Sequence, residues 1–173
     1  MDTLTAIHTR RSIRQYTNQD VSDDDVRILL EAAMMAPSAH NCQPWHFVVV
    51  RSRELKEAVS HLHPYIHMAK DAPLGILVCG NTQREKTPGF WVQDCAAATQ
   101  NLLLATAEIG LGAVWTGIHP LQDRAKEFQK LFDLPNHIPP LAYIVLGHPA
   151  QESKHMSRFD LDKVSLEIYG GKG

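Results

Sequence analysis

Arginines gather near the start of the chain, in the run Arg10-Arg11-Ser12-Ile13-Arg14. A guanidinium group presents a planar fork of donors that matches a phosphate, and a serine adds a hydroxyl donor. The same run also suits the end of a short helix, because cations stabilise the negative end of the helix dipole. The spacing therefore predicts either a grip for a small anion or a set of solvated charges.

A second polar group interrupts an otherwise apolar part of the chain, in the stretch PSAHNCQPWHFVVV at 37–50. Ser38, His40, Asn41 and Gln43 lie there beside segments that look made for a core. Buried polar groups need hydrogen-bond partners. Asparagine and glutamine carry both a donor and an acceptor, which suits the edge of a heterocycle. The alternative is that these side chains bond only to nearby backbone groups.

The glycine-rich run GLGAVWTG at 110–117 resembles a dinucleotide fingerprint without being one. The pattern G-x-G-x-x-G requires glycine where Trp115 stands, and the expected helix precedes the glycines instead of following them. The chain has no G-x-x-x-x-G-K-[ST] motif either. Thr116 and Gly117 could still present backbone N–H groups to a ligand, because glycine permits close approach.

Three histidines and one cysteine raise the question of metal binding or nucleophilic catalysis. His61, His63 and His67 could hold a metal, but no H-E-x-x-H motif or obvious third ligand accompanies them, so we expect surface histidines and no metal site. Cys42 has no activating neighbour and is predicted to be a packed thiol. Since no side chain stands out as an acid, base or nucleophile, a bound cofactor is expected to carry the chemistry.

Helix-like and strand-like segments alternate along the chain and position these groups. Apolar periodicity and capping signals such as Ser22 and Ser52 predict four helices, one capped by Ser52 and the others over 4–9, 23–35 and 122–132. A longer helix over 89–109 is apolar around much of its circumference and is expected to be central and buried. Short β-branched runs predict strands over 47–50, 75–79, 113–116 and 142–146. This alternation indicates a mixed α/β class.

Composition limits the class of protein. The chain has 173 residues, which predicts a single domain over 1–173. Its net charge of -2, with acids and bases scattered, argues against a nucleic-acid binder but leaves room for a small anionic ligand. No apolar run is long enough for a membrane span, and the start lacks the apolar core of a signal peptide. Three cysteines without C-x-x-C spacing favour a reducing cytoplasm.

Four of these stretches together resemble the FMN-dependent nitroreductase family. They are R-R-S-I-R near the start, A-P-S-A-H-N-C-Q-P-W after the first long helix, G-L-G-A-V-W-T-G-I-H-P past the midpoint and S-R-F-D near the end. The resemblance implies an α+β three-layer sandwich of the nitroreductase-like fold. It also implies an intertwined homodimer with two FMN molecules at the subunit interface, in which the long helix over 89–109 serves the dimer core.

The resemblance also assigns roles to residues of this sequence. Arg10 and Ser12, assisted by Arg11, would hold the phosphate or ribityl end of FMN, with Arg158 as a second phosphate contact and Lys154 as a helper. Arg14 would lie by the pyrimidine edge of the flavin. The flavin ring would be lined by Pro37, Ser38, Ala39 and Asn41 of the other subunit, and by Gln43. The backbone around Trp115, Thr116 and Gly117 would face the ring and direct an N–H at flavin N5.

The implied activity is reduction of nitroaromatic, quinone or similar acceptors by NADH or NADPH. Hydride transfer through flavin N5 would follow a ping-pong order, and the flavin would carry the chemistry without a catalytic side chain. The alternatives are a related flavoenzyme that performs dehalogenation or dehydrogenation, and a flavin-binding protein without catalytic activity. The short region over 70–91 implies a more open site than in larger members, or one that segments of the partner close.

Overall fold

The computed structural model describes residues 2–152 and 156–171. Its centre is an antiparallel sheet of four strands in the order β1-β2-β4-β3. The strands span Trp45–Val50 (β1), Leu74–Gly80 (β2), Gly112–Gly117 (β3) and Pro140–Gly147 (β4). Every residue of the two central strands, β2 and β4, is buried, because both faces of the sheet are covered. The strands β1 and β3 therefore form the two edges.

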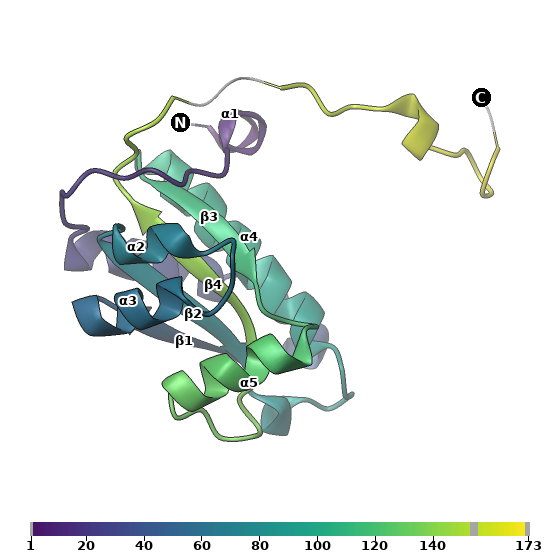
Figure 1. Cartoon of the computed structure of the whole chain (residues 1–173). Helices are drawn as coiled ribbons and strands as arrows, with labels where there is room; N and C mark the ends of the chain where they lie inside the picture. Colours follow the sequence, from purple (N-terminus) through teal and green to yellow (C-terminus); the bar gives the residue numbers. More distant parts are fainter. Residues whose placement is uncertain (1, 153–155, 172–173) are drawn as a thin grey trace.

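Helices cover both faces, so the fold has three layers (Figure 1). On one face, α2 (Asp23–Met34) and α4 (Trp91–Glu108) pack their apolar residues against alternate side chains of the sheet. On the other face, α3 (Arg53–Ser60) and α5 (Gln122–Leu131) enclose a second core. The predicted α+β class with three layers is confirmed. The pairing of β2 with β4 at the centre of the sheet is a feature that local sequence patterns could not predict.

Local signals place the helix ends where the sequence predicts them. The Ser22 hydroxyl oxygen accepts a hydrogen bond from the Asp25 N–H at 3.0 Å and caps α2. The Ser52 hydroxyl oxygen accepts one from the Leu55 N–H at 3.2 Å and caps α3. Gly110 ends the long helix α4 with φ of +79°, a conformation that costs glycine little.

The arginine run forms an arm that follows the helix α1 (Thr3–Thr9) and lies along the edge strand β3. Ser12 forms a parallel bridge with Ala113, and the Ile13 N–H donates to the Ala113 carbonyl at 3.0 Å. Ile13 packs directly on Gly112, where an added Cβ would lie 2.8 Å from the Ile13 side chain. The arm can approach the strand this closely only because Gly112 has no side chain.

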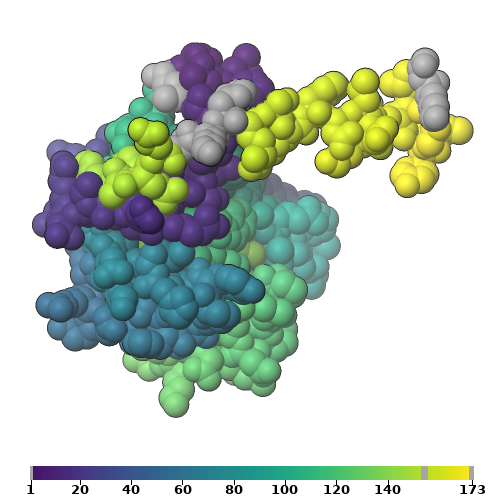
Figure 2. Space-filling model, turned by 45° about the horizontal axis from the view of Figure 1, so that its top comes forward, coloured from purple at the N-terminus to yellow at the C-terminus, as the bar shows by residue number. Residues whose placement is uncertain are grey.

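The C-terminal segment leaves the body of the fold. Residues 156–171 extend away from the sheet and its helices (Figures 1 and 2). The segment contains one short 3₁₀ helix, at Leu161–Lys163. Its large apolar side chains are exposed, which is unusual for a segment of this composition. They are Met156, Phe159, Leu161, Val164, Leu166, Ile168 and Tyr169.

None of the helices in the described ranges combines the length and the apolar character that crossing a membrane requires.

Candidate functional site

The arm and the start of the C-terminal segment bring cations together. Partial burial, with the nearby charges of Arg158 and Arg11, lowers the pKa of the Arg10 guanidinium. Like charges held in proximity repel each other, so an anion that binds among these arginines would relieve the repulsion and stabilise the cluster. Ser12 follows directly and is exposed. The structure thus brings Arg10, Arg11 and Arg158 near one another, and their role in holding a phosphate stays a prediction.

Arg11 has a positioning role within this cluster. Its Nη1 donates to the carbonyl oxygens of Arg10 at 2.7 Å and His8 at 2.8 Å. Its Nη2 donates to the Met156 carbonyl at 3.3 Å, which links the arm to the C-terminal segment. The side chain therefore fixes the backbone that carries Arg10 and Arg158. The predicted helper Lys154 lies outside the described residues.

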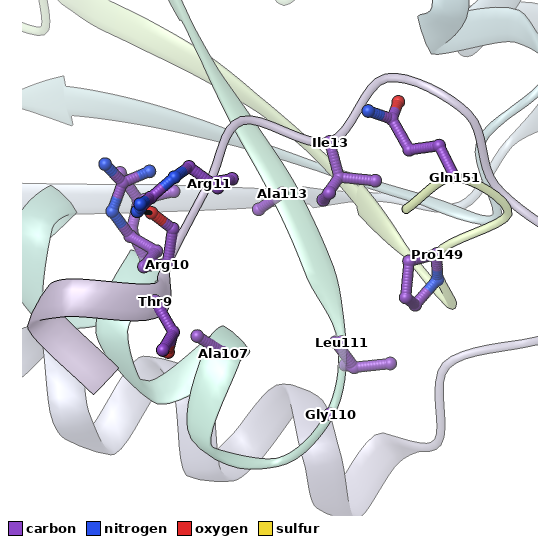
Figure 3. Close-up of a pocket in the computed structure, with 11 residues that line it drawn as sticks. Thr9, Arg10, Arg11, Ile13, Ala107, Gly110, Leu111, Ala113, Pro149 and Gln151 are labelled. Atoms are coloured by element: carbon purple, nitrogen blue, oxygen red, sulfur yellow. Dashed lines mark hydrogen bonds between the residues drawn. The ribbon is translucent and has the colours of Figure 1, made fainter. Parts of the chain in front are cut away.

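A cavity of about 280 Å³ lies beside the arm (Figure 3). Arg10 and Arg11 lie at one end of it and Gln151 at the other. Between them the wall is formed by small and apolar residues of the arm, the end of α4 and β3, including Ile13, Leu111 and Ala113. The Gln151 Oε1 accepts from the Arg14 N–H at 2.8 Å, so the far end of the cavity holds the arm in place.

The edge strand β3 offers backbone donors to whatever lies beside it. The Ile118 N–H donates to the Leu141 carbonyl on the β4 side, whereas the Ala113 carbonyl faces outward and accepts from Ile13. Backbone groups alternate in direction along a strand, so the N–H groups of Trp115 and Gly117 also point away from β4. An added Cβ at Gly117 would meet no heavy atom within 4 Å, which leaves open space beside this donor.

The Thr116 side chain has a structural use instead. Its hydroxyl donates to the Tyr143 carbonyl at 2.6 Å, and the residue is buried. A ligand at this edge would therefore meet the backbone around Thr116 and not its hydroxyl.

A second cavity, of about 380 Å³, lies against the end of the edge strand. It gathers residues from the arm, the strand, the segment after α3 and the first turn of α5. The sequence-predicted members are Arg14, Trp115, Thr116 and Gly117. The members that sequence reasoning missed as ligand contacts are His63, Pro64, Tyr65, His67, Met68, Val114 and Arg124.

Two signals could have pointed to these missed residues. The histidines His63 and His67 stood out in the sequence only as candidate metal ligands or surface residues, and the prediction of a surface residue is wrong for His63, which is buried. In the described ranges no group of three or more histidine, cysteine or acidic side chains could hold a metal ion. Arg124 occupies the first turn of α5, where the helix dipole disfavours a cation. A residue placed against its local preference often serves something outside its own helix.

His63 is a buried, neutral side chain in the wall of this cavity. Its Nδ1 accepts from the Tyr65 N–H at 3.2 Å, which places the proton of the neutral ring on Nε2. Nε2 is shielded from solvent and has no hydrogen-bond partner among the described residues. Burial, followed by the charges of Arg124 and His67, lowers the pKa of His63 to about 4. Burial is the main cause of the lowered pKa of His63, and the nearby positive charges add to it.

The loop over 37–43 carries the second predicted group of residues. Three non-glycine residues in it have positive φ: His40 (53°), Asn41 (52°) and Gln43 (48°). Such conformations are strained, and proteins tend to keep them at functional sites. The Asp94 carboxylate accepts from the Ala39 N–H at 3.0 Å, and the Ser38 hydroxyl oxygen accepts from the Gln43 N–H at 3.0 Å. The loop is therefore held by specific contacts.

This loop and the arm lie at opposite edges of the sheet. The loop leads directly into β1, whereas the arm lies along β3. None of the residues over 37–43 lines either of the two cavities described above. Pro37, Asn41 and Gln43 are exposed in the single chain. The structure therefore brings the predicted residues together in two groups and does not join the groups within one chain.

The cysteines are not arranged for nucleophilic chemistry. All three are free, and Cys42 is half-buried beside Asp94. Burial raises the pKa of the Cys79 thiol to about 12, and it also raises that of Cys95. A thiol with a raised pKa carries little of the reactive thiolate.

Comparison with known proteins adds the family. The model of the nitroreductase family matches residues 7–63 and 60–148. A protein of Methanothermobacter thermautotrophicus named for NADH dehydrogenase/NAD(P)H nitroreductase activity is 50% identical over 96% of this chain and 87% of its own length.

Solved structures agree with this match. A crystal structure from Parabacteroides distasonis, named for the same activity, has a TM-score of 0.92 at 36% identity and covers 96% of this chain and 98% of its own. A nitroreductase from Desulfovibrio desulfuricans in complex with FMN has a TM-score of 0.83 at 35% identity and covers 97% of each chain. On sequence and fold alike, the chain belongs to the nitroreductase family.

Proposed function

We propose that this protein is an FMN-dependent oxidoreductase that uses NAD(P)H to reduce nitroaromatic, quinone or similar acceptors. The observation that carries the proposal is the cationic cluster of Arg10, Arg11 and Arg158 beside an edge strand with outward-facing N–H groups. A phosphate and a flat heteroaromatic ring are the two parts of FMN that such an arrangement suits. The FMN complex among the related structures supports this assignment.

The residues of this chain fit the cofactor. Arg10, Ser12 and Arg158 would hold the phosphate, because two or three cations match a group of charge near -2. Gly117 leaves open space where its side chain would be, so a ring could approach the backbone there, and its N–H points away from β4. Arg14 lines the cavity next to this strand, so it would lie beside the ring edge.

When bound, FMN would supply the two-electron chemistry by accepting a hydride from NAD(P)H and passing electrons to the acceptor. The side chains around it would bind and orient. A cation such as Arg14 near the pyrimidine edge favours the negative charge of a reduced ring, so it adjusts the reduction potential without moving a proton. We assign no catalytic acid, base or nucleophile to the chain.

Donor and acceptor would use the cavity in turn, in a ping-pong order. The cavity of about 380 Å³ is the size of a single ligand pocket, and the FMN ring would occupy part of it. Two substrates could not lie there beside the ring together. Initial rates at several fixed acceptor concentrations should give parallel lines in a double-reciprocal plot.

The working form would be a homodimer in which each site is shared. The arm and the loop over 37–43 lie at opposite edges of one sheet, so a partner's loop could complete the site that the arm begins. An apolar surface supports this assembly: Leu4 and Ile7 on α1, with Met34 and Met35 at the end of α2, are exposed. The apolar C-terminal segment, which extends from the body, would pack on the partner.

The visible absorption spectrum of the purified protein tests the proposal. We expect flavin bands, or their appearance after FMN is added, and anaerobic addition of NADH and then NADPH should bleach them and identify the donor. A protein that remains colourless and takes up no FMN would contradict the proposal. A flavin that binds but is reduced by neither nucleotide would leave a flavin-binding protein without the proposed activity.

A further inference from the structure

The second cavity has an unusually basic lining. Its lining includes Arg14 from the arm, Arg124 from α5, and His63 and His67 from the segment after α3. No aspartate or glutamate lines it. The side chain of Asp123, next to Arg124 in the sequence, pairs with Lys126 at 3.7 Å instead. The charge in this cavity is therefore not balanced by its own walls.

Arg124 is held in the wall of the cavity by its contact with the edge strand. Its Nη1 donates to the Gly117 carbonyl at 2.6 Å, and the guanidinium is partly buried. One hydrogen bond uses one of the five N–H donors of a guanidinium group. No carboxylate in the described ranges forms an ion pair with it. A pre-oriented arginine with most of its donors free is suited to bind an anion.

We propose that Arg124 binds an anionic group of the substrate that lies beside the flavin, so that the site selects negatively charged substrates. This inference rests on the proposed function and adds the substrate class to it. The ligand chemistry is a carboxylate, phenolate or phosphate oxygen on or attached to an aromatic ring. It can come from the acceptor or from the pyrophosphate of NAD(P)H, and the experiment below separates the two sources.

The lowered pKa of His63 agrees with this assignment. Burial is the first cause of the shift, and the charges of Arg124 and His67 lower the pKa further. His63 stays neutral at physiological pH, which leaves the arginines as the permanent charges of the wall. Arg14 is already assigned to the ring edge, so Arg124 is the cation available to the second ligand.

The test compares two unreactive ligands of nearly equal shape on the flavin-loaded protein. Benzoate carries a charge and benzamide does not, and each binding constant can be measured from the perturbed flavin absorption. We expect the wild type to prefer benzoate. Arg124→Met should lower the ratio of the benzamide Kd to the benzoate Kd by about tenfold, the effect of losing one hydrogen bond to a charged group. Arg124→Lys should retain most of that ratio.

A matched control comes from the same helix. Lys126 lies two residues further along α5 and so on a different face of the helix; its side chain is 74% exposed, and it does not line the cavity. Lys126→Met removes the same net charge from the same helix and should leave the ratio unchanged. A structural loss in Arg124→Met would weaken both ligands equally, so the ratio isolates the charge. Equal ratios in the wild type and in Arg124→Met would overturn the proposal that Arg124 binds an anionic group of the acceptor.

Anaerobic reduction of the bound flavin tests whether Arg124 instead binds the pyrophosphate of the electron donor. NADH carries a pyrophosphate, whereas 1-benzyl-1,4-dihydronicotinamide is a neutral hydride donor. If the anion is that of the dinucleotide, Arg124→Met should slow reduction by NADH about tenfold and leave the neutral donor unaffected. Proportional effects on both donors, together with unchanged ligand ratios, would overturn the inference. Absence of bound flavin would instead contradict the proposed function, so the two failures are distinguishable.

Discussion

The cationic cluster at the arm gives the sharpest prediction for single residues. Arg10 lies close to Arg158 and Arg11, and this proximity together with burial lowers its pKa. The pair Arg10→Ala and Arg158→Ala removes two donors to the phosphate, so FMN affinity should fall by at least about a hundredfold. Fluorescence titration of the apoprotein measures it.

Riboflavin supplies the control for this double variant, because it has the same ring without the phosphate. Its affinity should change little, and the far-UV circular dichroism should match that of the wild type. Retention of FMN with wild-type affinity would show that the phosphate assignment is wrong.

His63 predicts how stability depends on pH. Its pKa is lowered from 6.5 to about 4 on folding, so between these values the unfolded chain holds more protons than the folded one. The free energy of unfolding should therefore fall as the pH decreases through this interval, by at most about 1.4 kcal/mol per pH unit from this residue. Above pH 6.5 the effect should vanish.

Urea unfolding at pH 7.5 and pH 5 measures the effect against two variants. His63→Asn keeps an acceptor for the Tyr65 N–H but cannot titrate, so its stability should fall less between the two pH values. His61→Asn changes an exposed histidine that lies 3.2 Å from Glu57, and it should retain the contribution of His63. Equal falls in the wild type and in His63→Asn would contradict the assignment.

At the scale of elements, two glycines of β3 have opposite roles. An added Cβ at Gly112 would lie 2.8 Å from Ile13, whereas one at Gly117 would meet no heavy atom within 4 Å. Gly112→Ala should push the arm away from the strand and destabilise the protein by about 1–3 kcal/mol. Gly117→Ala should leave the free energy of unfolding unchanged or raise it by up to about 1 kcal/mol.

Flavin affinity separates the same two variants in a different way. Gly117→Ala should weaken FMN binding without loss of stability, because its methyl group fills the space beside the outward N–H. Urea unfolding of the apoprotein and flavin titration give the two quantities. Normal FMN binding by Gly117→Ala would show that the ring does not approach this part of the strand.

Local patterns were sufficient to predict the elements. The capping signals of Ser22 and Ser52 and the apolar periods of the helices were confirmed within a few residues. These features depend on interactions across a few residues of the chain. The strand order and the path of the arm along β3 depend on pairings between distant segments, which a single sequence does not reveal.

The residues of the candidate site also fall into those that the sequence could predict and those that it could not. Arg10, Ser12, Arg14 and the loop over 37–43 could be proposed because their residue types cluster in the sequence. Arg124 stands apart from the other predicted residues in the sequence, and the histidines around His63 suggested only a metal question, so neither was proposed as a ligand contact. They meet Arg14 only through the packing of α5 and the segment after α3 against the sheet edge.

At the scale of the whole molecule, many large apolar side chains of the described residues are exposed. In the C-terminal segment Phe159 is 80% exposed and Leu161 is 71% exposed. If these side chains pack on a partner, Phe159→Ser with Leu161→Ser should weaken dimerisation by about a hundredfold, because two large apolar side chains lose their burial. Sedimentation equilibrium should then show a larger share of the 19.4 kDa species.

A surface control uses an exposed apolar side chain at the start of α5. Leu121 precedes α5 and is 52% exposed, so Leu121→Ser should leave the association unchanged. A wild-type protein that sediments as a 19.4 kDa monomer at all concentrations would contradict the shared-site proposal.

The placement of the arm and the loop at opposite sheet edges makes the proposed dimer open to complementation. A chain impaired at Arg14 and a chain impaired at Asn41 would each form only defective homodimers. When the two are unfolded together and refolded in equal amounts, each mixed dimer receives one site with both defects and one with neither. Such a mixture should recover about a quarter of the wild-type activity from two inactive parents, as random pairing of subunits in a twofold dimer requires.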